Sequence, residues 1–140
     1  FIFGPSTALF ENCMIHSKRN SYVTAASTPK EAKYGYIFKH CKLTAEPGVD
    51  KVYLGRPWRP YAYTLFIECE LGKHIVPAGW HNWGKQSNEE TARYMEYKNT
   101  GEGANVSERV AWNKQLTKKE AEAVTVDAIF GTQSNWNPID

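Results

Sequence analysis

The residues best suited to chemistry lie in one short segment that places an arginine among aromatic side chains. The segment reads Tyr53-Leu54-Gly55-Arg56-Pro57-Trp58. Gly55 permits a tight backbone turn and Pro57 fixes the chain, so together they are expected to present Arg56 between two aromatic rings. An arginine held in this way is preorganised for bidentate pairing with a carboxylate. Tyr53 and Trp58 offer flat faces that suit stacking on sugar rings, although core aromatics beside a surface ion pair would produce the same pattern.

A second aromatic segment adds two tryptophans in a turn context and makes Trp83 a further candidate. It reads Pro77-Ala78-Gly79-Trp80-His81-Asn82-Trp83. The remaining reactive residue types are scattered. The three cysteines have no close pair, which excludes the usual zinc arrangements. The four histidines fit no catalytic order and are interpreted as surface or structural residues; they are His16, His40, His74 and His81.

Composition narrows the classes of function that these residues can serve. The 140 residues fit one domain, and 17 Lys and Arg against 15 Asp and Glu leave a net charge of +2. A nucleic-acid-binding protein of this size usually has a larger basic excess on one face, so that function is disfavoured. No apolar run approaches the roughly 18 residues that would suggest a membrane span.

An internal repeat indicates which elements position the candidate residues. Segments that carry Phe at their first and Cys at their fourth residue begin 28 residues apart, at Phe10, Phe38 and Phe66, and Tyr94–Asn99 is a weaker fourth copy. The spacing from the first to the fourth residue requires a bend or bulge. Such short units, rich in aromatic and β-branched residues and separated by Pro and Gly, are typical of strands that coil around a parallel β-helix.

Stacked coils lie about 4.8 Å apart, so equivalent positions should touch and form internal ladders. Cys13, Cys41 and Cys69 are therefore expected to be rungs of one ladder. The spacing leaves two states open, a disulfide between adjacent rungs or three buried free thiols. The only helix that the sequence predicts spans Thr117 to Val124, outside the coil, because Thr117 and Glu120 form a capping box.

The segment Leu54–Trp58 looks like the signature of the pectin methylesterases, the carbohydrate esterases that demethylate pectin. Further matches keep the family's order and spacing along essentially the whole chain; they are Phe1–Gly4 followed by Phe10–Cys13, Pro77–Trp80 with Trp83, Glu96–Ala104 and Arg109–Trp112. The resemblance implies an all-β, right-handed parallel β-helix. It assigns residues 1–140 to the C-terminal portion of a single β-helix domain whose N-terminal coils precede this chain.

The resemblance also implies a mechanism in which two aspartates hydrolyse the methyl esters of polygalacturonate and release methanol. One attacks the ester carbonyl, and the other acts as acid and then as base, through an acyl-enzyme that water resolves. Arg56 maps onto the arginine that pairs with the nucleophile. Phe3, Tyr53, Trp58 and Trp83 map onto aromatic residues of the substrate cleft. No metal and no organic cofactor is expected.

Both catalytic aspartates are expected upstream, with the nucleophile immediately before Phe1. Asp50, Asp127 and Asp140 match neither context. The 140 residues alone are therefore expected to be inactive. The implied partner is methyl-esterified homogalacturonan, bound by a monomeric, secreted or periplasmic protein without a membrane span or a nucleic-acid ligand.

The resemblance further bears on the cysteines. Plant relatives have a disulfide at positions that match Cys13 and Cys41. A bridge there would leave Cys69 a free buried thiol.

Two alternatives use the same architecture for another function. A polygalacturonase would cleave the glycosidic bond with two carboxylates, but the Asn-Thr-Asp, Asp-Asp and Gly-His-Gly motifs of that family are absent from this sequence. A non-catalytic carbohydrate-binding homologue would keep the aromatic cleft and replace the carboxylates. The residue before Phe1 distinguishes this second alternative from the esterase.

Overall fold

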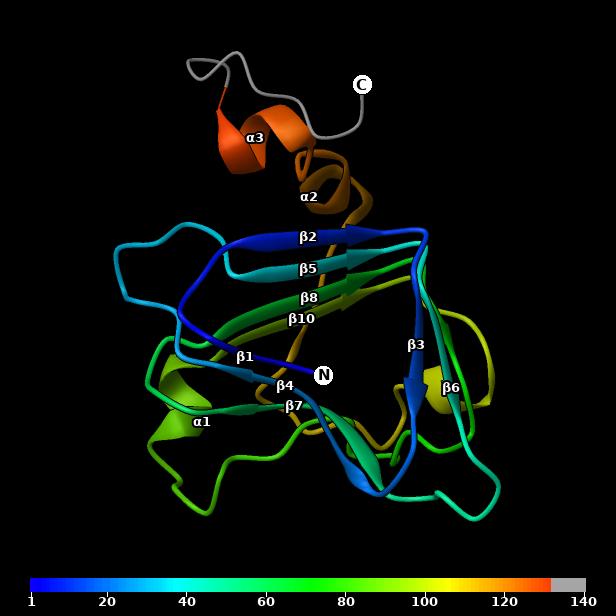
Figure 1. Ribbon diagram of the computed structural model, residues 1–140. Coiled ribbons are helices and arrows are strands. Elements are labelled where there is room, and N and C mark those ends of the chain that lie inside the picture. The colour runs from blue at the N-terminus through cyan, green and yellow to red at the C-terminus, as the bar shows by residue number, and fades with distance from the viewer. Residues whose placement is uncertain (132–140) are drawn as a thin grey trace.

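Each coil of the chain visits three parallel sheets in turn, and the coils stack on one another (Figure 1). The computed structural model describes residues 1–131; Asp140, one of the three aspartates considered above, lies outside the described residues. Every strand pair in the three sheets is parallel. The predicted parallel β-helix is therefore confirmed.

The strands are short, and neighbouring strands of a sheet come from successive coils. Sheet A contains β1 (Ile2–Gly4), β4 (Ser21–Ala26) and β7 (Val52–Pro57). Sheet B contains β2 (Ala8–Glu11), β5 (Tyr36–Lys39), β8 (Tyr63–Ile67), β10 (Arg93–Tyr97) and β11 (Lys114–Gln115). Sheet C contains β3 (Met14–Ser17), β6 (Lys42–Ala45) and β9 (Glu70–Leu71).

The 28-residue repeat is the register of sheet B over the first three coils. Phe10 pairs with Phe38, and Phe38 pairs with Phe66. Their rings stack inside the coil with centroids 4.9 and 4.5 Å apart and interplanar angles of 17° and 7°. The predicted ladder is confirmed here, since equal spacing in the sequence places identical rings in van der Waals contact.

The bend predicted within each repeat lies between sheets B and C. One residue at each corner has a left-handed backbone, with φ of 56° at Asn12, 52° at His40, 48° at Glu68 and 44° at Lys98. A left-handed residue changes the direction of the chain sharply, so in the first three coils only two residues separate the strand of sheet B from that of sheet C. The corner thus explains why the first and fourth positions of the repeat both face inward.

The 28-residue spacing placed the fourth copy of the repeat two residues away from its actual register in sheet B. Glu96, and not Tyr94, pairs with Phe66 in β10. The reason is a change of packing in this coil. Trp80 packs against Phe66 at 6.0 Å, and Tyr94 stacks on Trp80 at 4.3 Å, so a tryptophan from the preceding turn continues the aromatic ladder.

The predicted helix near the C-terminal end is present but shorter than expected. Helix α2 (Lys118–Glu122) begins after Thr117, whose side chain forms the complete capping box with Glu120. Three further short helical segments were not predicted: α1 (Asn88–Thr91), η1 (Glu102–Ala104) and α3 (Val126–Phe130). Helices α2 and α3 lie outside the coil, next to sheet B (Figure 1). They cover its outer face, because Ala121 and Val124 pack in one cluster with Ile37 and Leu65.

Gly55 serves close packing and not a turn, which corrects the expectation for the arginine segment. Strand β7 runs straight through Gly55 and Pro57, and Gly55 does not have a positive φ. A Cβ atom at this position would lie 2.3 Å from Thr24 Oγ1 and 3.1 Å from the ring of Trp80. The glycine therefore lets β7 approach both neighbours, and this approach sets the position of Arg56.

The three cysteines form the predicted ladder just after the left-handed corners. The Cys41 thiol donates to the carbonyl of Phe10 at 3.3 Å, and the Cys69 thiol donates to the carbonyl of Phe38 at 3.4 Å. All three are free thiols, so the bridge between Cys13 and Cys41 that the resemblance implied is not formed in the structure. The ladder of free thiols is the arrangement observed.

We expect one thiol to react with Ellman's reagent in the native protein, because Cys13 is half-buried whereas Cys41 and Cys69 are buried. The hydrogen bond with Cys41 and the burial of the thiol raise the pKa of Cys69, which keeps it protonated and unreactive. Denaturation should expose all three. A Cys13→Ser variant is the matched control and should leave no reactive native thiol. Three fast-reacting native thiols would overturn the ladder, and fewer than three after denaturation would reveal a disulfide.

We expect Gly55→Ala to lower the free energy of unfolding by about 1–3 kcal/mol, since the added methyl group overpacks the space beside Thr24 and Trp80. Removal of the Thr24 hydroxyl relieves the closest contact. A double-mutant cycle with Thr24→Ala should therefore give a combined loss smaller than the sum of the two single losses. Denaturant unfolding measures all four proteins. Strictly additive losses would show that the two residues do not compete for this space.

Candidate functional site

The predicted site residues lie on the outer face of sheet A and on the turns that follow it. We call this surface the aromatic face; it consists of Phe3, Tyr22, Tyr53, Arg56, Trp58, His81 and Trp83. The register across the sheet aligns Phe3 with Ala25 and Ala25 with Arg56, and it aligns Tyr22 with Tyr53. The outward side chains therefore form two rows across the sheet. One row is Tyr22 and Tyr53, and the other is Phe3, Ala25 and Arg56.

Arg56 is clamped between two rings and has no anionic partner among residues 1–131. Its guanidinium carbon lies 4.3 Å from the ring centroid of Tyr22 and 3.7 Å from that of Trp83. Its Nε atom is buried without a hydrogen-bond partner. Among residues 1–131, no carboxylate forms an ion pair with it. The site therefore holds an oriented positive charge that is available to an anion.

Trp83 reaches Arg56 from a backbone conformation that large residues rarely adopt. Its φ is 63°, and Gly84 after it has a φ of 70°. A non-glycine residue held in the left-handed region costs about 1–3 kcal/mol, and such residues cluster at functional sites. The Nδ1 atom of His81 accepts a hydrogen bond from the Trp83 N–H at 2.9 Å. The turn thus holds Trp83 in place, with its side chain 42% exposed.

Tyr22 and His81 are the two residues of this face that the sequence analysis did not assign to it. The Tyr22 ring stacks on Tyr53 at 5.2 Å, and His81 meets both rings edge-on at 5.6 and 5.2 Å. No periodic signal points to Tyr22, because it precedes its partner Tyr53 by more than the 28 residues of the repeat. His81 stands between two tryptophans in the sequence, which is the one local signal that could have marked it.

Phe3 and Trp58 form the other end of the aromatic face. Their rings meet edge-on at 5.5 Å, and the side chains are 71% and 37% exposed. The Trp58 N–H donates to the Ala26 carbonyl at 2.9 Å, which extends the pairing of β7 with β4 by one residue. The backbone of Trp58 is therefore fixed while its ring remains open to a ligand.

A buried ion pair supports this face from inside the coil. Arg109 Nε lies 3.0 Å from Glu96 Oε2, and the two side chains are 2% and 1% exposed. Arg109 also donates to the carbonyls of Val76 and Pro77, while Trp80 Nε1 donates to Glu96 at 3.2 Å. This network fixes the ring of Trp80 beneath Gly55.

None of the described acidic residues supplies a catalytic carboxylate beside Arg56. Asp50 is bonded to Asn20, and Asp127 lies in the first turn of α3. Burial raises the pKa of Tyr94 well above its usual value, whereas the positive charge of Arg56 acts in the opposite direction. Tyr94 is therefore protonated near neutral pH and is no base. Within residues 1–131, the site holds a cation and aromatic surfaces without a nucleophile.

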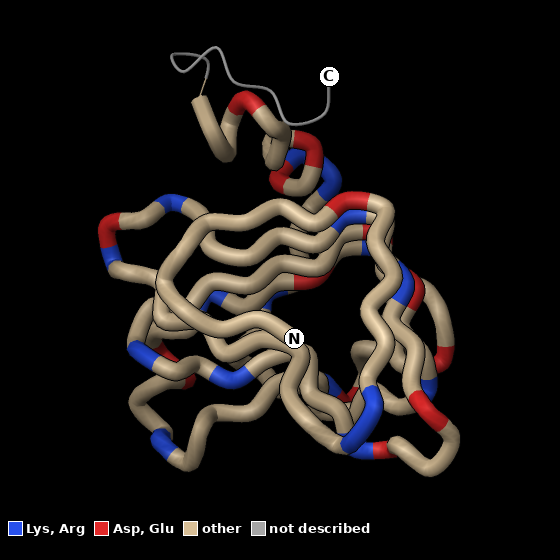
Figure 2. Tube along the Cα trace, viewed as in Figure 1, with Lys and Arg blue, Asp and Glu red and all other residues tan. Residues whose placement is uncertain are grey.

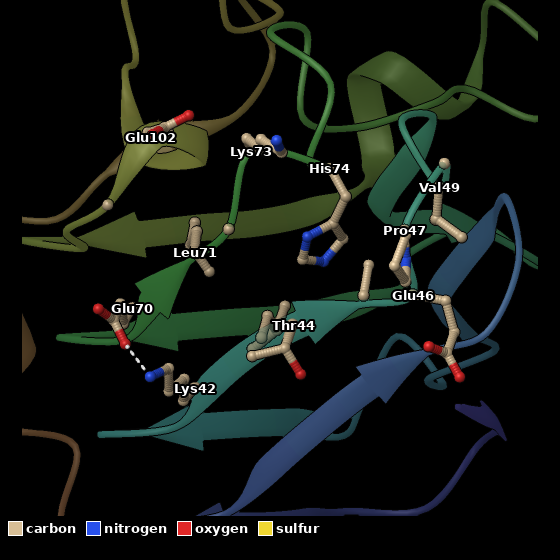
Figure 3. A pocket seen from close by; sticks show the side chains of 15 residues that line it. Lys42, Thr44, Glu46, Pro47, Val49, Glu70, Leu71, Lys73, His74 and Glu102 are labelled. Atoms are coloured by element: carbon tan, nitrogen blue, oxygen red, sulfur yellow. Dashed lines mark ion pairs between the residues drawn. The ribbon is translucent and has the colours of Figure 1, made fainter.

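A separate hollow of about 650 Å³ lies beside sheet C, away from the aromatic face (Figure 3). In Figure 3 the His74 ring lies above Thr44 and to the right of Leu71, and Lys42 is paired with Glu70 at 3.3 Å. Burial lowers the pKa of His74, so its imidazole is neutral near pH 7. The charged residues around this hollow are of both signs, and none of the predicted site residues lines it. We therefore base the functional argument on the aromatic face.

Other ligand classes find little support in the part of the chain that the structure describes. Basic and acidic residues are interspersed along residues 1–131 (Figure 2). No group of three or more His, Cys, Asp or Glu side chains there is placed to hold a metal ion. Among the described helices, none has the length and apolar character needed to cross a membrane.

Comparison with solved structures shows the same architecture in pectin methylesterases. The carrot enzyme matches the whole chain with a TM-score of 0.86 and 31% identity, and the match covers 50% of that protein. The enzyme PemA from Erwinia chrysanthemi matches 98% of the chain and 48% of its own length, with a TM-score of 0.79 and 28% identity. A pectin methylesterase solved in complex with a hexasaccharide matches the whole chain and 48% of its own length, with a TM-score of 0.80 and 28% identity.

Sequence comparison gives the same family. Pectinesterase 31 of Arabidopsis thaliana is 41% identical over 122 residues, which are 86% of this chain and 38% of that protein. Probable pectinesterase 67 of the same organism is 38% identical over an alignment of 147 positions that covers 99% of this chain and 41% of that protein. The chain thus spans half or less of the length of these relatives. Because the pectinesterase family model matches residues 1–133, the chain belongs to the pectinesterase family.

Proposed function

We propose that this chain supplies the arginine and the aromatic wall of a pectin methylesterase active site. The complete gene product would hydrolyse the methyl esters of homogalacturonan and release methanol. The observation that carries this proposal is the guanidinium of Arg56, clamped between two rings on an exposed aromatic surface and without a carboxylate partner among the described residues. Family membership and the hexasaccharide complex of a structural relative support a polymeric uronate as the ligand.

The register of sheet A supports a nucleophile just upstream of this chain. Ile2 pairs with Thr24 and Phe3 with Ala25. Continued by two residues, the same register sets the residue before Phe1 opposite Tyr22, in the outward row whose ring contacts Arg56. A carboxylate at that position would therefore face the guanidinium. Following the resemblance to pectin methylesterases, we propose that the nucleophilic aspartate lies there and the acid/base aspartate further upstream.

In this proposal, Arg56 acts on the nucleophile and not on the proton transfers. Its charge favours the ionised carboxylate, and its planar fork orients the attacking oxygen toward the ester carbonyl. Attack forms an acyl-enzyme while methoxide leaves with a proton from the second carboxylic acid. Water activated by that group then hydrolyses the acyl-enzyme and regenerates the carboxylate. Phe3, Tyr53, Trp58 and Trp83 bind and orient the galacturonate rings.

The substrate and the fold also suggest where and how the protein works. Pectin is an extracellular polymer, so we place the protein in the secreted or periplasmic fraction. We propose that it acts as a monomer, because one chain supplies the whole aromatic face from strands β1, β4 and β7 and the turn that follows. We also propose that it needs no metal or organic cofactor.

We expect Arg56→Ala to lower kcat by roughly a hundredfold or more in the complete gene product, because the nucleophile loses both its charge partner and its orientation. Arg56→Lys should also be impaired, since one ammonium group cannot reproduce the planar fork or its stacking. Methanol release from highly methylated pectin measures both. Lys119→Ala, which removes an exposed positive charge from helix α2 beside sheet B, is the control. Wild-type turnover by Arg56→Ala would contradict the assignment.

Residues 1–140 alone should release no methanol, because a guanidinium stays protonated near neutral pH and cannot act there as base or nucleophile. Activity should return when the upstream coils are supplied as a separate polypeptide or in one chain. A heat-treated sample gives the background. Methanol release by residues 1–140 would place the chemistry within this chain. Pectin binding without methanol release by the complete gene product would favour the carbohydrate-binding homologue.

A further inference from the structure

We propose that His81 is a positioning residue that sets the orientation of Arg56 through Trp83. Its effect on turnover rests on the proposed function, whereas its effect on the turn does not. His81 belongs to the aromatic face, where its ring contacts Tyr22 and Tyr53 and its Nδ1 accepts from the Trp83 N–H. The two rings that lie against Arg56 are those of Tyr22 and Trp83. His81 therefore acts through its neighbours and not on a substrate.

The backbone and the ring of His81 are both fixed. Its N–H donates to the Gly55 carbonyl at 3.1 Å, so the residue is tied to the strand that carries Arg56. Its ring meets Tyr22 at an interplanar angle of 71° and Tyr53 at 76°. These edge-on contacts leave the imidazole one orientation, in which Nδ1 points at the N–H of Trp83.

The hydrogen bond from Trp83 to His81 stabilises a backbone that would otherwise be unfavourable. Trp83 and Gly84 are consecutive left-handed residues, and each donates its N–H to the side chain two residues before it. Asn82 Oδ1 accepts from Gly84 at 2.8 Å, as His81 Nδ1 does from Trp83 at 2.9 Å. Side chains that accept from the backbone two residues ahead stabilise tight turns. The glycine adopts this conformation freely, so the tryptophan depends more on its acceptor.

This geometry assigns one tautomer to His81. Nδ1 can accept the Trp83 N–H only when it carries no proton, so the neutral ring is protonated at Nε2. A proton on Nδ1 would turn the acceptor into a donor and remove the bond. The titratable groups in contact with the His81 ring are the phenols of Tyr22 and Tyr53, and the guanidinium of Arg56 lies over the Tyr22 ring.

Loss of the acceptor should reach Arg56 because the two rings of its clamp are held differently. Tyr22 is part of strand β4 and stacks on Tyr53. Trp83 lies in a turn, and its indole is the closer ring to the guanidinium, at 3.7 Å. If Trp83 leaves the left-handed region, its indole moves and one side of the clamp opens. The guanidinium then samples orientations that do not face the nucleophile.

Two substitutions separate the acceptor from the rest of the side chain. His81→Asn keeps an acceptor, since an asparagine oxygen can bond the N–H two residues ahead as Asn82 already does. His81→Phe keeps an aromatic ring against Tyr22 and Tyr53 but has no acceptor. In the complete gene product, we expect His81→Phe to lower kcat by about ten- to a hundredfold, and His81→Asn to stay within about threefold of wild type. A purely structural role of the ring predicts the reverse order.

Proton–nitrogen correlation spectra of the complete gene product test the tautomer without reference to activity. The imidazole signals that vanish in His81→Asn belong to His81 and should show a protonated Nε2 and a bare Nδ1 at neutral pH. The Trp83 amide should shift strongly in His81→Phe and little in His81→Asn.

A protonated Nδ1, an unshifted Trp83 amide in His81→Phe, or wild-type kcat in that variant would overturn the proposal. If the complete gene product releases no methanol, the proposed function fails. The tautomer of His81 and the shift of the Trp83 amide signal still test the role of His81 in that case.

Discussion

The parallel pairing of each coil with the one before it is the constraint on which the other features depend. In sheets B and C the register follows the 28-residue repeat, which stacks Phe10, Phe38 and Phe66 and aligns the cysteines behind the left-handed corners. The same coils fix sheet A, where Tyr22 meets Tyr53 and Ala25 meets Arg56. The three sheets enclose one interior. A change in the register of one coil would therefore also displace the aromatic face on the outside of sheet A.

The C-terminal coil keeps the parallel pairing with the coil before it although it departs from the 28-residue spacing. Glu96 takes the position that a phenylalanine holds in the earlier coils, and Trp80 fills the space above Phe66. Burial of the carboxylate would be costly if it were unpaired, but Arg109 binds it with two nitrogens and also holds the carbonyls of the neighbouring turn. The pair therefore orders the turn that leads to His81 and Trp83, beneath the strand that carries Arg56.

The aromatic face combines a fixed cation with flat apolar surfaces, and this combination suits an anionic sugar polymer. A guanidinium between two rings keeps its charge but loses much of its freedom to rotate. Its buried Nε has no hydrogen-bond partner among the described residues. A carboxylate beside it would therefore gain a strong interaction while the arginine loses little further conformational entropy. The rings of Phe3 and Trp58 extend the surface along the strands.

The sequence by itself determined the coil, the stacking ladders of the first three repeats, the capped helix and the segment that carries Arg56, because local spacing and capping chemistry encode these features. It did not show that Gly55 serves close packing, that Tyr22 and His81 join the aromatic face, or that Glu96 opposes Phe66. Each of these depends on contacts between coils of unequal length, where no fixed period relates the partners. Only the tertiary structure, in which strand pairing and shared packing set the register, decided them.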